Sequence, residues 1–261
     1  MNVLLVGDVI GKPGRQLLEM FLPALIQEHQ LDLIIANGEN AAHGFGITEE
    51  TADQLYRTGV DILTSGNHIW DKKEILEYIS KESRLLRPAN YPANVPGKGY
   101  TITRTRSGLK AGVINLQGRI FMGPSDDPFA IGMQIVERIR KETPIIFVDM
   151  HGEASSEKQA MGWYLDGKVT AVFGTHTHVP TADLRILPAG TAYVTDIGMS
   201  GPYDSVIGID KDQIVQKFLD QMPTRFEVAK ENPILETVLV RLNPENGHAI
   251  SMERITRKGE K

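Results

Sequence analysis

The feature that most constrains the fold is a regular alternation of short apolar runs and helical patterns at the start of the chain. The runs Val3–Val6, Leu31–Ala36 and Asp61–Thr64 have the length and composition of buried strands. A helix opened by Pro13 lies between the first two runs, and a second helical pattern over Thr48–Arg57 lies between the next two. The order strand, helix, strand, helix, strand predicts a parallel sheet covered by helices.

The rest of the chain contains more strands than one parallel sheet can hold comfortably. Tyr100–Arg106 and Lys110–Leu116 are β-rich runs on either side of a Ser-Gly turn, which predicts an antiparallel hairpin, and Asp127–Lys141 predicts a helix. Further strands are expected at Pro144–Met150, Val169–Gly174, Leu184–Leu187, Ala192–Thr195, Leu235–Leu242 and Ala249–Arg257. The sequence therefore predicts an α/β fold of two packed sheets with helices outside.

Length and composition indicate a single-domain protein and argue against membrane and duplex-binding classes. The 261 residues show no internal repeat and no long linker, so we expect one domain over residues 1–261. No apolar stretch approaches the roughly 18 residues of a membrane span, and the N-terminus lacks the features of a signal peptide, so we expect a soluble protein with no membrane partner. The absence of cysteine fits the cytoplasm and leaves only N and O atoms as metal ligands. With a net charge of -5 and scattered basic residues, a site for a long nucleic-acid duplex is not expected.

A polar residue able to bind metal follows each of five apolar runs. In chain order these residues are Asp8, Glu39 with Asn40, Asn67 with His68, His151, and His176 with His178. Each alone has an ordinary explanation as a turn residue, a helix cap or a surface histidine. Because ligands of α/β sheets bind beyond the carboxyl ends of the strands, the five sets are expected to meet in one place. On an extended segment His176 and His178 would also point the same way.

The ligand types indicate two metal ions. Two carboxylates, two amides and three imidazoles are too many for one tetrahedral zinc, which takes about four ligands. Two ions that share a carboxylate, roughly 3.5 to 4 Å apart, would use them all. Mixed ligation of this kind favours iron or manganese, with zinc or magnesium as alternatives.

Other nucleotide-binding and hydrolytic motifs are absent. The stretch Gly7–Pro13 has one residue too few between its glycines for a phosphate-binding P-loop and a proline where Ser or Thr would hold magnesium. Gly44-Phe45-Gly46 lacks the third glycine of a dinucleotide fingerprint, and no Gly-x-Ser-x-Gly elbow of a serine hydrolase occurs.

The ordered blocks resemble those of the calcineurin-like metallophosphoesterases. The resemblance covers residues 7 to 178 through Gly-Asp, Asn-Gly-Glu-Asn, Gly-Asn-His, a lone His and Gly-Thr-His-Thr-His. The stretches GDVIGKPGR, NGENAAHGFGIT, SGNHIWD, GRIFM and THTHVPTAD are similar to a narrower branch, the YmdB-like bacterial phosphodiesterases. The resemblance implies a four-layer α/β/β/α sandwich of the metallophosphoesterase type. It also implies a cytoplasmic homo-oligomer that hydrolyses cyclic nucleotides, 2',3'-cyclic ones first and 3',5'-cyclic ones as an alternative, with iron or manganese.

The resemblance also implies a role for each ligand. The first metal would be held by Asp8 and His178, the second by Asn67, His151 and His176, and Glu39 would bridge the two. Three positions depart from the common family pattern. Ile10 stands where a histidine is usual, which makes Asn40 the replacement ligand; Glu39 replaces an aspartate; and Ile69 replaces an acidic residue.

The expected reaction is in-line attack on phosphorus by a hydroxide bound to the two metals, with His68 as proton donor or phosphate contact. His43 and Arg119 are candidate contacts to a small nucleotide substrate, although a loop position and an ion pair explain them equally well. Three alternatives remain: a phosphomonoesterase or nuclease on the same fold, a metal-dependent amidohydrolase, whose His-x-His pair ordinarily opens the chain, and a regulatory protein with a vestigial metal site.

Overall fold

The apolar runs at the start of the chain form parallel strands in the computed structural model, which describes residues 1–259. Strand β3 (Leu33–Asn37) pairs in parallel with β1 (Asn2–Val6) on one side and with β4 (Ile62–Thr64) on the other. Helices α1 (Gly11–His29) and α2 (Glu49–Arg57) connect them. The predicted alternation of strand and helix is confirmed.

Four strands from other parts of the chain complete this sheet to seven. Strand β12 (Pro233–Leu242) lies antiparallel to β1 and also pairs with β13 (Ala249–Lys258) and with β11 (Met199–Pro202). The short β2 (Asp8–Val9) pairs in parallel with β11. The sequence predicted β12 and β13 but neither β2 nor β11, because two to four residues are too few to show an alternating pattern.

The second sheet has six strands in the order β5-β6-β7-β8-β10-β9. They are β5 (Tyr100–Arg104), β6 (Lys110–Gln117), β7 (Ile146–His151), β8 (Ala171–Thr175), β9 (Arg185–Ile186) and β10 (Ala192–Val194). The antiparallel pairing of β5 with β6 confirms the predicted hairpin. Because β6, β7, β8 and β10 are parallel to one another, their carboxyl ends lie at one edge of the sheet.

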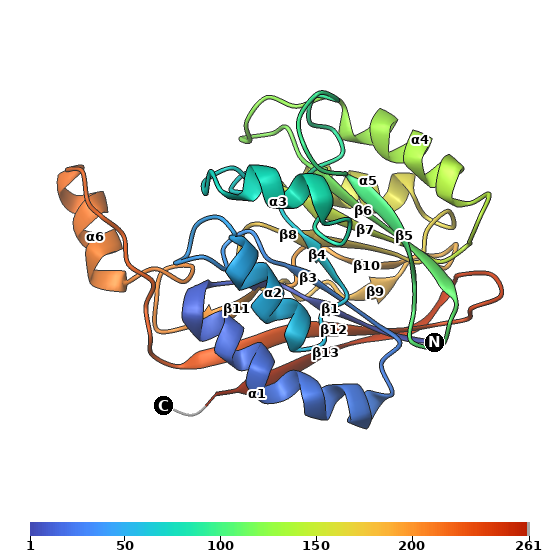
Figure 1. Cartoon of the computed structure of the whole chain (residues 1–261), viewed down its shortest axis with the longest axis horizontal. Helices are drawn as coiled ribbons and strands as arrows, with labels where there is room; N and C mark the ends of the chain where they lie inside the picture. The colour runs from blue at the N-terminus through green and yellow to red at the C-terminus, as the bar shows by residue number, and fades with distance from the viewer. Residues whose placement is uncertain (260–261) are drawn as a thin grey trace.

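Three hydrophobic cores separate the four layers. The central core packs the two sheets together through side chains such as Leu5, Ile35 and Phe147. One outer core lies between the seven-stranded sheet and α1, α2 and α3 (Ile75–Lys81). The other lies between the six-stranded sheet and α4 (Pro128–Ile139) with α5 (Ser155–Tyr164). Figure 1 shows α4 and α1 on opposite sides of the sandwich, and the α/β/β/α order is the predicted one.

The last helix, α6 (Lys211–Asp220), lies outside these layers. It projects from one side of the sandwich in Figure 1, and none of its residues is buried. Asp210 caps it by accepting hydrogen bonds from the backbone N–H groups of Asp212 and Gln213. Neither α6 nor any other helix in residues 1–259 combines the length and apolar character needed to cross a membrane.

Candidate metal centre

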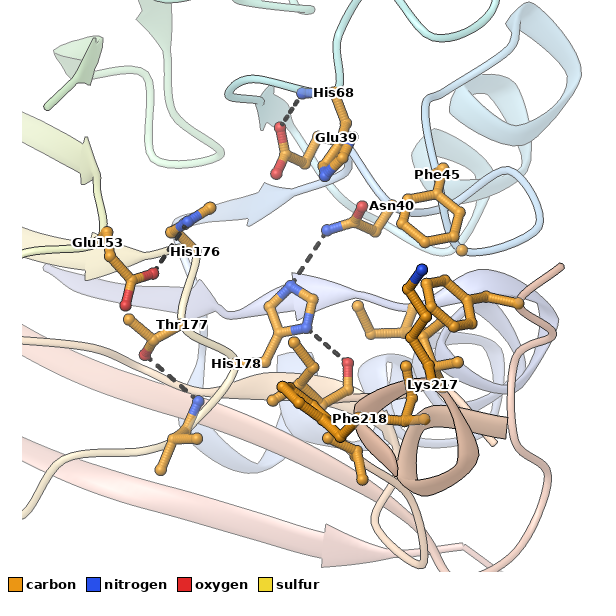
Figure 2. A pocket seen from close by; sticks show the side chains of 18 of the residues that line it. Glu39, Asn40, Phe45, His68, Glu153, His176, Thr177, His178, Lys217 and Phe218 are labelled. Atoms are coloured by element: carbon orange, nitrogen blue, oxygen red, sulfur yellow. Dashed lines mark hydrogen bonds and ion pairs between the residues drawn. The ribbon is translucent and has the colours of Figure 1, made fainter. Parts of the chain in front are cut away.

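Strand ends from both sheets meet at one edge of the sandwich and bring the seven predicted ligands together. Asp8 lies in β2, Glu39 and Asn40 follow β3, Asn67 follows β4, His151 ends β7, and His176 and His178 follow β8. Figure 2 shows Glu39, Asn40, His176 and His178 around one cavity. The local cause is the parallel arrangement of β1, β3, β4, β7 and β8, which places every carboxyl end at this edge.

One group of ligands surrounds His151, whose side chain is fully buried. His151 Nε2 lies 3.0 Å from Asn67 Oδ1 and 3.0 Å from Glu39 Oε1. The same nitrogen lies 3.1 Å from His176 Nδ1, and the ligand atoms of Glu39, His151 and His176 all lie within 4.8 Å of one another. An imidazole nitrogen makes one hydrogen bond, so three polar neighbours exceed its capacity and suit a shared cation.

A second group surrounds His178. Its Nε2 lies 3.6 Å from Asp8 Oδ1 and 3.2 Å from Asn40 Nδ2. His178 Nδ1 lies 2.8 Å from the backbone carbonyl of Ile207, which can only accept, so Nδ1 carries a proton and, in the neutral ring, Nε2 is the nitrogen that can bind a metal. The contacts thus form two groups of polar side chains, one around His151 and one around His178.

Two buried carboxylate oxygens provide the clearest test of whether the residues fit a metal. Within residues 1–259, Asp8 Oδ1 and Glu39 Oε1 are buried and accept no hydrogen bond. The other oxygen of each is fixed: Asp8 Oδ2 accepts from the N–H of His176 at 3.1 Å, and Glu39 Oε2 accepts from the N–H of His68 at 2.9 Å. An unsatisfied buried group costs about 1 to 3 kcal/mol or more if charged. A cation beside each oxygen would remove that cost.

The electrostatics favour ionised carboxylates beside charged imidazoles. Burial lowers the pKa of His151 and of His178, but Glu39 and Asp8 reverse both shifts and raise the pKa of His178 to about 9, so a metal ion would have to displace these protons. Burial raises the pKa of the Asp8 carboxyl, but His178 and His151 outweigh it and hold that pKa well below its usual value. Burial likewise raises the pKa of Glu39, and His151 reverses the shift. Burial, with the charge of His151, lowers the pKa of His176 to about 3. Ionised carboxylates and a neutral imidazole are the forms that bind metal.

A buried network behind the ligands was missed by the sequence analysis. His151 Nδ1 lies 2.9 Å from Thr175 Oγ1, which donates to Asp149 Oδ1 at 2.7 Å. With its hydroxyl proton given to Asp149, Thr175 can only accept from His151, so Nδ1 carries a proton and, in the neutral ring, Nε2 is the nitrogen that can bind a metal. Burial raises the pKa of Asp149 to about 7. The sequence signal for Asp149 is its position two residues before His151, which places both side chains on the same face of β7.

A buried ion pair holds the turn that carries the two histidines. Lys158 Nζ lies 2.7 Å from Asp196 Oδ2, and the two side chains are 1% and 0% exposed. Lys158 also donates to the carbonyl of Thr175 at 2.7 Å. Asp196 Oδ2 accepts from the N–H and the hydroxyl of Thr177, at 3.1 and 2.8 Å. Both charges therefore act on the backbone around His176 and His178.

The conformation of this turn corrects one expectation. His176 has φ 99° and His178 has φ 64°, so the segment is not extended as the sequence analysis assumed. A left-handed backbone at both positions is unusual for residues other than glycine. The bonds from Asp196 to Thr177 explain why the turn forms, and the turn directs His176 toward His151 and His178 toward Asp8.

His68 lies beside the ligands at the border of the cavity. Its side chain is 30% exposed, and its Nδ1 lies 2.8 Å from Asp71 Oδ2. The ring of Phe45 packs edge-on against it, with ring centroids 5.3 Å apart. An imidazole that donates from Nδ1 to a carboxylate has its Nε2 available to a substrate.

The cavity over the centre measures about 880 Å³ and has two unlike sides. One side carries the polar groups described above. The other carries apolar side chains that the sequence analysis did not select, including Phe45, Ile207, Ile209, Ile214, Phe218 and Phe226. Glu153, also missed, lies 3.2 Å from His176 Nε2 (Figure 2). No local pattern marks these residues, since they come from loops and from α6.

Two predicted substrate contacts lie elsewhere. His43 is exposed and lines a different cavity, on the other side of its loop. Arg119 is exposed and is not among the residues around the metal centre; its backbone N–H donates to both carboxylate oxygens of Glu157, at 3.0 and 3.1 Å.

Comparison with known proteins places this geometry in a family. The profile of the YmdB-like protein family matches residues 4–255. A Bacillus subtilis (strain 168) protein named 2',3'-cyclic-nucleotide 2'-phosphodiesterase is 48% identical over 255 residues, which cover 98% of this chain and 96% of that protein. A crystal structure of a hypothetical protein from Thermus thermophilus is 38% identical, with a TM-score of 0.93 over 100% of both chains. A Mycoplasma pneumoniae structure described as a novel phosphatase is 35% identical, with a TM-score of 0.92 over 99% of this chain and 93% of that one.

Proposed function

This chain belongs to the YmdB-like protein family, and we propose that it hydrolyses 2',3'-cyclic nucleotides at a centre of two metal ions. The observation that carries the proposal is the convergence of seven side chains with N and O donor atoms at one edge of the two sheets. Two of them, Asp8 and Glu39, each have a buried carboxylate oxygen without a hydrogen-bond partner within residues 1–259. The 48% identity to a protein named as a 2',3'-cyclic-nucleotide phosphodiesterase supports the reaction.

The two groups of candidate ligands support a proposal of two metal sites. One ion would be held by Asp8, Asn40 and His178, the other by Asn67, His151 and His176, with Glu39 between them. Mixed imidazole, amide and carboxylate donors suit iron or manganese, with zinc or magnesium as alternatives. Bound ions would lower the pKa of water toward neutrality and offset negative charge on the phosphoryl oxygens.

The protein's own residues would position the ester and move the proton. A bond forms between a water oxygen and phosphorus while the bond from phosphorus to the 2' oxygen breaks, which leaves a 3'-phosphate. His68, protonated on both ring nitrogens, would donate its Nε2 proton to the departing 2' oxygen while Asp71 accepts from Nδ1 and orients the ring, and the proton released by the attacking water would restore Nε2–H. The backbone N–H of His68 fixes Glu39 at the same time, so one residue links the proton donor to the bridging ligand.

The apolar side of the cavity favours a nucleotide over a simple phosphate ester. Phe45 and Phe218 line the space next to the candidate metal ligands; in Figure 2 Phe45 lies beside Asn40, and Phe218 lies beside Lys217. A cavity of about 880 Å³ is in the range of small-molecule sites. Aromatic faces stack well on bases, whereas a plain phosphate would leave them exposed to water.

The decisive experiment combines metal analysis with a substrate panel. The purified protein is expected to contain about two ions per chain. It should hydrolyse 2',3'-cyclic AMP faster than 3',5'-cyclic AMP or bis(p-nitrophenyl) phosphate, and a chelator should abolish the activity reversibly. A protein without metal, whose activity no metal restores, would refute the proposal.

A phosphomonoesterase is the second candidate, because the Mycoplasma pneumoniae structure is described as a phosphatase. Hydrolysis of 3'-AMP faster than 2',3'-cyclic AMP would favour it. We also propose from the family resemblance that the protein is a cytoplasmic homo-oligomer. Light scattering after size-exclusion chromatography tests the oligomer, and a monomer at micromolar concentration would contradict it.

A further inference from the structure

A second cavity, of about 1050 Å³, carries an excess of positive charge. Its charged lining consists of Lys12, Lys72, Arg225 and Lys230 against one carboxylate, Glu227, and His43 lies among them. The whole chain has a net charge of -5, so this local excess runs against the overall balance. A concave surface lined by one sign of charge concentrates its field on a ligand of the opposite sign.

These cations are not used within the described part of the chain. Across residues 1–259, Lys12, Lys72, Arg225 and Lys230 form no ion pair. Many other cations, such as Lys141, also form no ion pair within residues 1–259, but these four line one cavity. Within the described part of the chain, the positive charge of the cavity is therefore available to an anion.

The basic cavity adjoins the metal cavity. Phe226 lines both, and the loop that places His43 in the basic cavity places Phe45 in the metal cavity. Val228 packs so closely on this loop that a side chain at Gly44 would come within 2.6 Å of it. The segments 43–45 and 225–228 thus lie between the two spaces, since Phe226 lines both and the first segment contributes to each.

The loop conformation explains why His43 faces away from the metal ligands. His43 has φ 61° and Gly44 has φ 91°, so the chain reverses direction between His43 and Phe45. A left-handed histidine is tolerated at modest cost, and glycine has no such cost. The histidine that the sequence selected as a substrate contact therefore belongs to the second cavity.

We propose that the basic cavity binds a backbone phosphodiester of a short single-stranded oligoribonucleotide whose terminal 2',3'-cyclic phosphate occupies the metal centre. The inference rests on the proposed function. In such a strand the next phosphate lies on the 5' side of the terminal nucleotide, one nucleoside away from the reacting phosphorus. A 2',3'-cyclic mononucleotide carries only a hydroxyl there and cannot use the cations. Phe226, shared by both cavities, lies where the intervening nucleoside would pass.

The geometry selects a short single strand and not a duplex. The cations line a cavity, and they do not extend along a face as a duplex site requires. The negative charge of the remaining surface repels a longer polyanion. No base-specific donors are needed, since the cations contact phosphate alone.

The test compares substrates that differ only in length. We expect kcat/KM for a trinucleotide ending in a 2',3'-cyclic phosphate to exceed that for the matching mononucleotide by about tenfold at low salt, and the ratio to fall as salt rises. In the triple variant Lys12→Gln/Arg225→Gln/Lys230→Gln the ratio should approach one. The matched control Lys141→Gln removes an exposed cation at the end of α4, on the far helix layer, and should keep the ratio.

Different failures have different meanings. Equal kcat/KM for both lengths, with the mononucleotide hydrolysed, overturns the second site and leaves the proposed function intact. If neither the trinucleotide nor the mononucleotide is hydrolysed, the proposed function is wrong, and a binding measurement then tests the basic cavity separately. A fluorescent trinucleotide with a 3'-phosphate should bind the wild type with salt-dependent affinity and the triple variant at least about fivefold more weakly. Equal binding by both proteins overturns the inference.

Discussion

The two sides of the metal cavity are built in opposite ways. The floor consists of side chains such as Glu39 and Asn40, 0% and 2% exposed and placed just after β3, and of the groups buried with them, Asp8 and His151, each 0% exposed. The wall is α6, which has no buried residue and presents Phe218 at 79% exposure. The floor is thus held by two sheets, whereas the wall is held by one projecting helix.

The difference suggests that the floor serves the chemical step and that the wall serves substrate binding. Charged groups in the floor are immobilised by buried partners, as Lys158 and Asp196 immobilise the turn at Thr177. Such preorganisation serves the chemical step, because the donors cannot relax as charge develops. The wall contributes apolar surface that a substrate can cover. We expect changes in the floor to alter metal content, stability or turnover, and changes in the wall to alter KM.

The largest effect is expected for Glu39→Gln in the floor. The change keeps the shape but removes the charge of a buried carboxylate whose Oε1 has no hydrogen-bond partner within residues 1–259. At least one ion per chain should be lost, and kcat/KM should fall roughly a thousandfold, or about 4 kcal/mol. Metal analysis and kinetics check it, with Glu153→Gln, on an exposed carboxylate at the rim, as the comparison. Full metal content would contradict the bridging role.

A stability effect is expected for Lys158→Met. Removal of one partner from a buried pair leaves Asp196 unpaired, which should lower the free energy of unfolding by about 3 to 5 kcal/mol. The control Lys110→Met breaks an exposed pair and should cost less than about 1 kcal/mol. Urea denaturation of both variants measures the two free energies. Equal losses would show that burial of the pair does not matter.

His68 lies where floor and wall meet. For His68→Ala we expect kcat to fall about a hundredfold with unchanged metal content, because a positioned proton donor is lost. Asp71→Asn should produce a smaller fall, since the ring remains but its orientation is less fixed. Loss of metal with unchanged turnover per bound ion would assign His68 to the metal site instead.

The smallest effect is expected in the wall. Phe218→Ala should raise KM several-fold, as loss of base stacking costs about 1 to 3 kcal/mol. Because Phe218 is exposed, the free energy of unfolding should change by less than about 0.5 kcal/mol. Phe129→Ala, on α4 and away from the cavity, is the kinetic control. An unchanged KM for Phe218→Ala would break the proposed division between floor and wall.

Local patterns were sufficient for the floor of the cavity. Asp8, Glu39, His151, His176 and His178 each follow or end an apolar run, and parallel strands bring such ends together whatever the details of packing. The two-sheet architecture followed from the number of strands. Local patterns failed for α6, because its role depends on a cavity that other segments complete. They also failed for the turn at His176, because the bond that holds it joins Thr177 to Asp196, 19 positions away.

The sequence by itself therefore determined which residues supply the candidate ligands and at which edge of the sheets they gather. Only the tertiary structure decided how they pair: Asn40 contacts His178 across 138 positions, and Lys158 becomes a buried partner of Asp196. The tertiary structure also places His43 in the basic cavity, whereas the sequence had suggested a contact to substrate at the metal centre. The physical reason is the separation along the chain of the residues that determine each property. Strand periodicity is a property of a few neighbouring residues, whereas burial, ion pairing and cavity lining depend on how distant segments pack.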